Sequence, residues 1–177
     1  MFLGQNVILT ADQCNDLIEY AKPKMIPSTL GEGFRGKNVL VPNKRVSYST
    51  FCNIKSDNFP HLYDIIRESV EAYTDFKLLT EDKITTSIIK YPVGGFLYKH
   101  NDTYHEGLRL VGIGNLNEGY KGGEFQTDNG SLNYGRGNFG WFWPNVDHQV
   151  SKVEEGERWS MVIWLFNNNL EIKKGLF

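Results

Sequence analysis

Two histidines and one carboxylate in the second half of the chain have the types and spacing of a metal site. His100 and Asp102 are separated by one residue, and His148 lies further along the chain. In an extended strand, side chains i and i+2 emerge on the same face, so His100 and Asp102 could bind one ion while Asn101 points away. Two imidazoles and one carboxylate leave three octahedral positions open, as in non-haem Fe(II) oxygenases. A tetrahedral zinc site with these ligands would leave only one.

Arg158 is the candidate partner for a second, anionic ligand. The three side chains and Fe(II) together carry a charge of about +1, so one added carboxylate brings the centre near neutrality. A dicarboxylate such as 2-oxoglutarate could chelate the metal through its keto acid end, and its far carboxylate would then need a cation inside the protein. Leaving that carboxylate unpaired costs on the order of several kcal/mol, whereas a guanidinium offers it two charge-assisted hydrogen bonds.

Other histidines compete for these roles. His105 and Glu106 could supply metal ligands instead, but Glu106-Gly107 is typical of a turn after the strand, so this cluster ranks lower. His61 follows Pro60 at a predicted helix start and is expected to be solvated. His148 could be an ordinary hydrogen-bonded histidine, and Arg158 an ordinary ion-pair partner. The order of all four residues favours the metal site.

The segment from His148 to Phe166 predicts how a metal ligand and an anion ligand reach one cavity. Val150 and Val153 follow His148, Gly156 allows a turn, and Arg158 opens the apolar run RWSMVIWLF. This pattern indicates strand, turn and strand.

The stretch YPVGGFLYKHND at residues 91–102 resembles the iron-binding strand of prolyl 4-hydroxylase-type 2-oxoglutarate/Fe(II) dioxygenases. The similarity extends over nearly the whole chain, through residues 9–18, 44–51, 115–117 and 122–125, Gly137, Trp143, His148, Val153, Gly156 and Arg158. Two features depart from the pattern. Collagen-type and plant-type members usually have lysine in place of Arg158, and the segment Pro144–Asp147 is short, so collagen specificity is not transferred.

The resemblance implies that His100, Asp102 and His148 bind Fe(II) and that Arg158 holds the far carboxylate of the co-substrate 2-oxoglutarate. It also nominates Tyr91 as a hydroxyl donor to that carboxylate, the alternative being a core aromatic at a strand end. The implied reaction uses O2 to hydroxylate an unactivated C–H bond and releases succinate and CO2, with ascorbate as a candidate reductant. Arg45 could face the site, but a strand arginine is more often an ion-pair partner.

The leading substrate hypothesis is a prolyl residue in a peptide or protein. Four aromatic residues could flank an extended proline-containing chain, or could equally be strand core: Tyr98, Tyr104, Trp141 and Trp143. Two alternatives stay open, a hydroxylase of a free amino acid or other small molecule and a jelly-roll binding module that has lost turnover. Alkylation-repair dioxygenases usually carry a second arginine at the position of Trp164, which argues against that branch.

The pattern predicts an α+β, β-rich fold in one domain over residues 1–177. Helices are expected over residues 10–24, with Thr10 and Gln13 as a capping box, and from Pro60 to about Phe76. Short apolar runs then predict strands over residues 85–91, 108–116, 139–143 and 158–166. The expected core, over about residues 84–168, is a double-stranded β-helix of jelly-roll or cupin-like type, with the N-terminal helical part (about 10–76) packed on one sheet. Residues 31–38 could form a lid over the site, although such loops are more often surface connections.

Composition limits the partners and the compartment. The net charge is −2 and no lysine–arginine run occurs, so nucleic-acid binding has little electrostatic support. Cys14 and Cys52 are too few for a disulfide framework and are expected to be reduced, buried thiols. The N-terminal residues resemble no signal peptide, and no run is long enough to span a bilayer. We therefore expect a soluble, cytoplasmic enzyme with no membrane partner.

Overall fold

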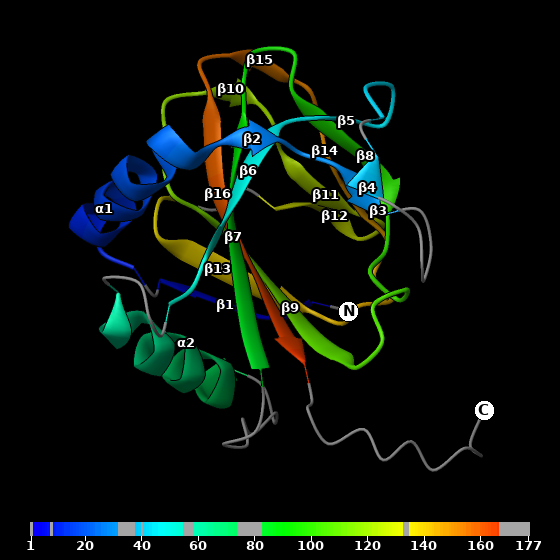
Figure 1. The fold of residues 1–177 in the computed structure, drawn as a ribbon. Coiled ribbons are helices and arrows are strands. Elements are labelled where there is room, and N and C mark those ends of the chain that lie inside the picture. The colour runs from blue at the N-terminus through cyan, green and yellow to red at the C-terminus, as the bar shows by residue number, and fades with distance from the viewer. Residues whose placement is uncertain are drawn as a thin grey trace, which may run out of the picture.

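Two antiparallel sheets form the body of the protein in this computed structural model (Figure 1), which describes residues 2–7, 9–31, 38–39, 41–54, 59–73, 83–132 and 135–166. The larger sheet has seven strands in the order β1-β13-β9-β16-β7-β6-β2. Its strands are β1 (Phe2–Val7), β13 (Asn138–Phe142), β9 (Leu108–Asn115), β16 (Arg158–Phe166), β7 (Lys83–Tyr91), β6 (Tyr48–Cys52) and β2 (Ile26–Pro27).

The smaller sheet has five strands in the order β12-β11-β14-β8-β5. They are β12 (Gly130–Leu132), β11 (Phe125–Thr127), β14 (His148–Val150), β8 (Phe96–His100) and β5 (Arg45–Val46). Two short pairs complete the strands: β10 (Lys121–Gly122) with β15 (Val153–Glu155), and β3 (Leu30–Gly31) with β4 (Asn38–Val39).

The central strand β16 is buried on both faces and so joins two hydrophobic clusters. Trp159, Met161, Ile163 and Leu165 belong to the cluster on the helical side. Val162, Trp164 and Phe166 belong to the cluster between the two sheets. The alternation follows from the pleat, which sends successive side chains to opposite faces. Burial on both faces explains why this strand is an unbroken apolar run in the sequence.

Both N-terminal helices cover one face of the seven-stranded sheet (Figure 1). Helix α1 (Ala11–Ala21) begins at Thr10, whose side chain accepts from the Gln13 backbone N–H, while the Gln13 side chain accepts from the Thr10 N–H. The predicted capping box is therefore confirmed. The expected extension to residue 24 is a separate 3-10 turn (Lys22–Lys24), which begins directly before Pro23.

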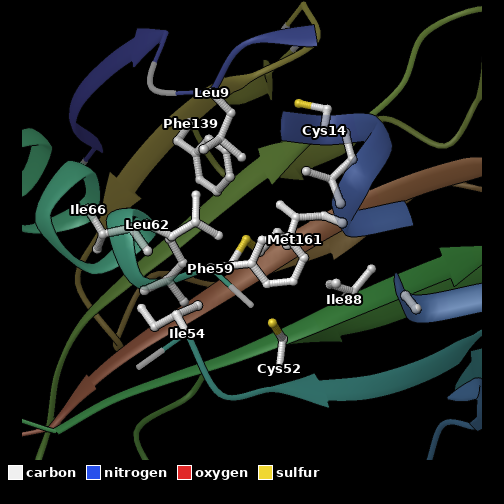
Figure 2. Packing of buried hydrophobic residues seen from close by; sticks show 14 of the residues in the cluster. Leu9, Cys14, Cys52, Ile54, Phe59, Leu62, Ile66, Ile88, Phe139 and Met161 are labelled. Atoms are coloured by element: carbon white, nitrogen blue, oxygen red, sulfur yellow. The ribbon is translucent and has the colours of Figure 1, made fainter. Parts of the chain in front are cut away.

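Helix α2 (Pro60–Tyr73) packs beside α1 on the same sheet. Figure 2 shows Leu62 and Ile66 of α2 in one cluster with Cys14 of α1 and with Phe139 and Met161 of the sheet. The N-terminal helices packed on one sheet are thus as predicted. Cys14 and Cys52 are both buried and form no disulfide, again as predicted.

Strand bounds differ from the sequence expectation by one or two residues. Strand β7 begins at Lys83, β9 ends at Asn115 and β13 ends at Phe142, so Trp143 lies in the following turn. The expected ends at residues 76 and 168, and most of the proposed lid (32–37), fall outside the described residues. Within the described part of the chain, the helices are too short or too polar to cross a bilayer.

Candidate metal centre and anion site

The pairing of β8 with β14 brings the two histidines together. His100 and His148 are direct partners in this antiparallel pair, and their ring centroids are 4.2 Å apart. Asp102 follows β8 by two residues, and its carboxylate oxygens lie 3.8 Å from His100 Nε2 and 4.0 Å from His148 Nε2. One ligand atom from each of the three residues can be chosen so that all lie within 4.8 Å of one another. The structure therefore brings together the three residues selected from the sequence.

Backbone carbonyls set the orientation of both imidazole rings. His100 Nδ1 lies 3.0 Å from the carbonyl oxygen of Tyr98, and His148 Nδ1 lies 2.9 Å from that of Val146. A carbonyl can only accept, so Nδ1 of each ring carries the proton and Nε2 keeps its lone pair. Both lone pairs are therefore available on the nitrogens that approach Asp102, as a metal-binding histidine requires.

Burial shifts the pKa of each of the three cluster residues in favour of its neutral form. Asp102 and His148 are each only 5% exposed, and His100 is partly buried. Burial lowers the pKa of His148 and of His100, and the neighbouring His148 lowers the pKa of His100 further. Burial raises the pKa of Asp102, an effect that His100 partly offsets. The imidazoles are thus held neutral, which leaves a buried carboxylate without a cationic neighbour in the cluster.

The donor set fits Fe(II). A divalent ion would supply the missing positive charge beside Asp102, and two neutral imidazoles with one carboxylate are the ligands that leave three octahedral positions open. No other group of three potential ligands is this close among the described residues.

The cluster opens into a cavity of about 90 Å³ between the two sheets. This is room for several water-sized groups, the scale of a small organic acid. Its walls are mostly apolar side chains of both sheets: Ile89, Leu97, Val111, Ile113, Phe125, Phe142, Val150, Val162 and Trp164. The polar groups that reach it, besides the cluster, are those of Thr29, Arg45, Tyr91, Tyr104 and His105.

Arg158 is a buried cation next to this cavity. It is 1% exposed, and its guanidinium carbon lies 5.5 Å from the centroid of the Tyr91 ring, which itself lines the metal cavity. Arg158 Nη2 donates to Asn115 Oδ1 at 2.9 Å and Nη1 to Ser160 Oγ at 3.4 Å, while Nε has no partner. These contacts are neutral, so the guanidinium has no carboxylate in the described structure to balance its charge.

The structure adds a second cavity that the sequence did not predict. Arg158 lines a polar cavity of about 210 Å³ together with Asn115, Asn117, Glu118, Tyr120 and Glu124, and Phe125 lines both cavities. Arg158 therefore lies between a polar cavity and the Tyr91 wall of the metal cavity. Contrary to the expectation from the sequence, Arg158 does not line the metal cavity itself; its guanidinium lies behind the Tyr91 ring that forms part of that cavity's wall.

The two competing histidines, His61 and His105, lie outside the ligand cluster. Glu106-Gly107 forms part of the turn before β9, and His61 is exposed on α2. His105 does line the metal cavity, and its charge lowers the pKa of Asp102, but it is not in the ligand cluster.

Two points about the walls of the site that the sequence left open are decided by the structure. Trp141 is fully buried in the helical-side cluster, where its Nε1 donates to Ser69 Oγ at 3.2 Å, so it cannot flank a substrate. Arg45, set aside as an ion-pair partner, lines the metal cavity and donates to Ser47 Oγ at 2.7 Å. The alternating segment Arg45-Val46-Ser47 was the available signal, but it gave no indication of which face was inside.

Comparison with known proteins gives a family match for the part of the chain that carries this site. Residues 86–166 match the model of the 2OG-Fe(II) oxygenase superfamily, and this range holds all three cluster residues, Arg158 and Tyr91. No curated protein sequence matches the chain.

Solved prolyl hydroxylases share the fold. A prolyl-4-hydroxylase from Pseudomonas putida is 18% identical with a TM-score of 0.70, over 93% of this chain and 91% of that one. The viral collagen prolyl hydroxylase of Paramecium Bursaria Chlorella virus-1, in its 2OG complex, is 18% identical with a TM-score of 0.65, over 92% and 94%. A Trichoplax adhaerens prolyl hydroxylase bound to a hypoxia inducible factor peptide is 15% identical with a TM-score of 0.65, over 88% and 76%. The predicted jelly-roll core is confirmed.

Proposed function

Since this chain is a 2-oxoglutarate/Fe(II) dioxygenase resembling the prolyl 4-hydroxylases, we propose that it hydroxylates prolyl residues in a peptide or protein. In the proposed reaction one C–H bond, O2 and 2-oxoglutarate give one C–OH group, succinate and CO2. One oxygen atom of O2 enters the substrate and the other enters succinate. The observation that carries the proposal is the largely buried His100–Asp102–His148 cluster in the wall of an apolar cavity, with the unbalanced Arg158 behind the Tyr91 ring of the same wall.

In this proposal the three cluster residues hold Fe(II), and Arg158 with Tyr91 holds the far carboxylate of 2-oxoglutarate. Fe(II) supplies O2 activation when bound. Arg158 would replace water around a carboxylate that is otherwise costly to bury, and its unpartnered Nε is one donor available for it. Tyr91 would add its hydroxyl while its ring keeps the guanidinium in place. None of these residues needs to act as a general base.

The apolar side chains that line the metal cavity would exclude water and position the substrate. Ile113, Val150 and Val162 line the cavity and expose few groups that hydrogen-bond to water. They would keep water out and hold the reacting C–H bond in one orientation, so that oxidation falls on the substrate.

The exposed tyrosines near the cluster support a peptide as the substrate. Tyr98 is 63% exposed and Tyr104 39% exposed, and both are near the cluster: Tyr104 lines the cavity and the Tyr98 carbonyl accepts from His100. Exposed aromatic faces suit an extended proline-containing segment. The Trichoplax adhaerens enzyme, with the same fold, is seen with a peptide bound.

Arg45 favours a second candidate, the hydroxylation of a free amino acid. Among the described residues no carboxylate is within ion-pair distance of Arg45, and its contacts are with Ser47 and the Thr29 carbonyl. A free amino acid would bring a carboxylate to this cation. A peptide would bring a backbone carbonyl instead.

We further propose that residues 1–177 act as one catalytic domain. In the described part of the chain, strands β7, β9 and β16 contribute to both hydrophobic clusters, so neither cluster can form without the large sheet.

The test is succinate formation from 2-oxoglutarate with Fe(II), O2 and ascorbate as reductant, using free proline and proline-rich peptides of increasing length. Turnover that rises with peptide length, with hydroxyproline in the product, supports the proposal. Turnover of free proline that peptides do not exceed supports the second candidate. Iron and 2-oxoglutarate binding without succinate from any substrate would contradict both and favour a binding module. Asp102→Ala is the control for iron not held by this site.

A further inference from the structure

Asn101 and Asp147 form a side-chain pair beside the candidate metal ligands. Asn101 Nδ2 donates to Asp147 Oδ1 at 2.9 Å. Asn101 lies between His100 and Asp102 in the chain, and Asp147 directly precedes His148. One hydrogen bond therefore connects the two segments that carry all three ligands.

Asn101 also fixes the turn that presents Asp102. Its Oδ1 accepts from the backbone N–H of Thr103 at 3.3 Å and from the Thr103 hydroxyl at 2.6 Å. The Asp102 N–H donates to the carbonyl of Pro144 at 2.8 Å, which ties this turn to the segment that leads to Asp147. The Asn101 amide thus hydrogen-bonds with both of its polar atoms: Oδ1 accepts within its own turn, and Nδ2 donates to Asp147 in the other segment.

Lys99 balances the charge of Asp147. Its ammonium lies 3.8 Å from Asp147 Oδ2, and it also pairs with Asp128 in the β11–β12 turn. Asp147 therefore has a partner on each oxygen, Asn101 on one and Lys99 on the other. An aspartate held this way has one preferred orientation, which makes it a firm support for the residue that follows it.

The cluster itself has little to hold it together before metal arrives. Strand pairing and two backbone carbonyls place the imidazoles, but no hydrogen bond joins the Asp102 carboxylate to either ring, since its oxygens lie 3.8 Å from His100 Nε2 and 4.0 Å from His148 Nε2. The ligands must nevertheless be held to within about 0.5 Å of their working geometry for tight binding. The necessary constraint has to come from outside the cluster.

We propose that the Asn101–Asp147 pair is this constraint: it positions His100, Asp102 and His148 for the metal ion without binding the ion itself. The inference rests on the proposed metal centre. Supports that orient metal ligands typically affect metal affinity by about 10–100-fold when removed, and a loss of that size is expected here.

The test measures Co(II) binding to the full chain by its visible absorption, which reports ligand geometry as well as affinity and needs no turnover. Asn101→Leu roughly keeps the side-chain volume and removes its hydrogen bonds. Asn101→Asp replaces the donor to Asp147 with a carboxylate, so that two negative charges repel each other. Both should weaken Co(II) binding by about 10–100-fold and change the absorption spectrum. The exchange variant Asn101→Asp/Asp147→Asn restores an amide–carboxylate pair in the reverse sense and should recover wild-type binding and spectrum.

Asp128→Asn is the matched control, because it removes the other partner of Lys99 but leaves the Asn101–Asp147 bond in place. It should bind Co(II) as wild type does. Wild-type affinity and spectrum in both single variants would overturn the inference, and so would an exchange variant as weak as Asn101→Asp. A wild-type protein that bound no Co(II) would overturn the metal centre and this inference together, so the two failures are distinguishable.

Discussion

The guanidinium of Arg158 lies against the ring of Tyr91, with its carbon 5.5 Å from the ring centroid, where β16 and β7 place the two residues opposite each other. The pair separates the metal cavity from the polar cavity behind it. This buried cation has one donor left for a further acceptor, because its Nε is unpartnered.

Replacing Arg158 should chiefly raise the requirement for 2-oxoglutarate. Hydrogen bonds to a charged group contribute about 1.5–3 kcal/mol each, so we expect the apparent KM for 2-oxoglutarate to rise roughly 10–100-fold in Arg158→Ala. Arg158→Lys should lose less, since it keeps the charge but not the bidentate geometry. Arg45→Ala is the control and should change the KM for substrate instead. An unchanged KM for 2-oxoglutarate in Arg158→Ala would show that the anion site is elsewhere.

Tyr91→Phe isolates the hydroxyl from the ring. The ring is 2% exposed and belongs to the cluster between the sheets, so the phenylalanine should keep both the packing and the stability. If the hydroxyl donates to 2-oxoglutarate, its loss should cost about 1 kcal/mol, roughly a fivefold rise in KM. Equal KM values with equal melting temperatures would identify Tyr91 as a core aromatic only.

Asp102→Asn should stabilise the metal-free protein while abolishing Fe(II) binding. The carboxylate is 5% exposed and burial raises its pKa, so its charged form costs folding free energy at neutral pH in the absence of metal. We expect the metal-free variant to gain about 1 kcal/mol in the free energy of unfolding and to lose Fe(II) binding. Asp16→Asn on the exposed face of α1 should do neither. Denaturant unfolding in the presence of a chelator measures the first effect, and a metal-free variant less stable than wild type would contradict it.

The metal-free protein should become less stable as pH falls below about 6.5, the ordinary histidine pKa. Folding lowers the pKa of His100 and His148, so in this window the unfolded chain binds protons that the folded protein does not. Asp102 acts in the opposite sense, because its raised pKa lets the folded protein take up a proton earlier as pH falls. As pH falls, the loss of stability caused by the histidines begins before the opposite effect of Asp102, because an ordinary histidine pKa is higher than an ordinary aspartate pKa. Denaturant unfolding at several pH values should show it, and His148→Gln should flatten the curve. Equal slopes in both proteins would contradict the assignment.

Gly112 tests the packing behind the site. A Cβ on Gly112 of β9 would lie 2.3 Å from the ring of Trp141 on β13, and one on Gly114 would lie 2.4 Å from the ring of Phe139. Both rings are fully buried under the helices, so they have little room to move. Gly112→Ala should cost roughly 1–3 kcal/mol in the free energy of unfolding. Unchanged stability would mean that Trp141 repacks freely.

Much of the site was predictable because it depends on short-range rules. One residue separates His100 from Asp102, and the pleat of a strand predicted both on one side, although the structure places His100 at the end of β8 and Asp102 in the turn that follows. The capping box at Thr10 and the strand predicted from the apolar run Arg158–Phe166 follow from equally local patterns, and the structure shows both. The sequence alone therefore determined which residues had to approach one another and the kind of sheet that could bring them together.

Which face of each strand is inside was decided only by the tertiary structure. Strand β13 is buried on both faces, so its apolar run could not show that Trp141 packs under the helices while Phe142 lines the cavity. Arg45 reached the cavity, and Arg158 came to lie between two cavities, through pairing with β8 and β7. The Asn101–Asp147 bond likewise needs the turn before β14 to meet the end of β8. Such contacts join residues far apart in the chain, and periodicity along a strand carries no information about its neighbours across a sheet.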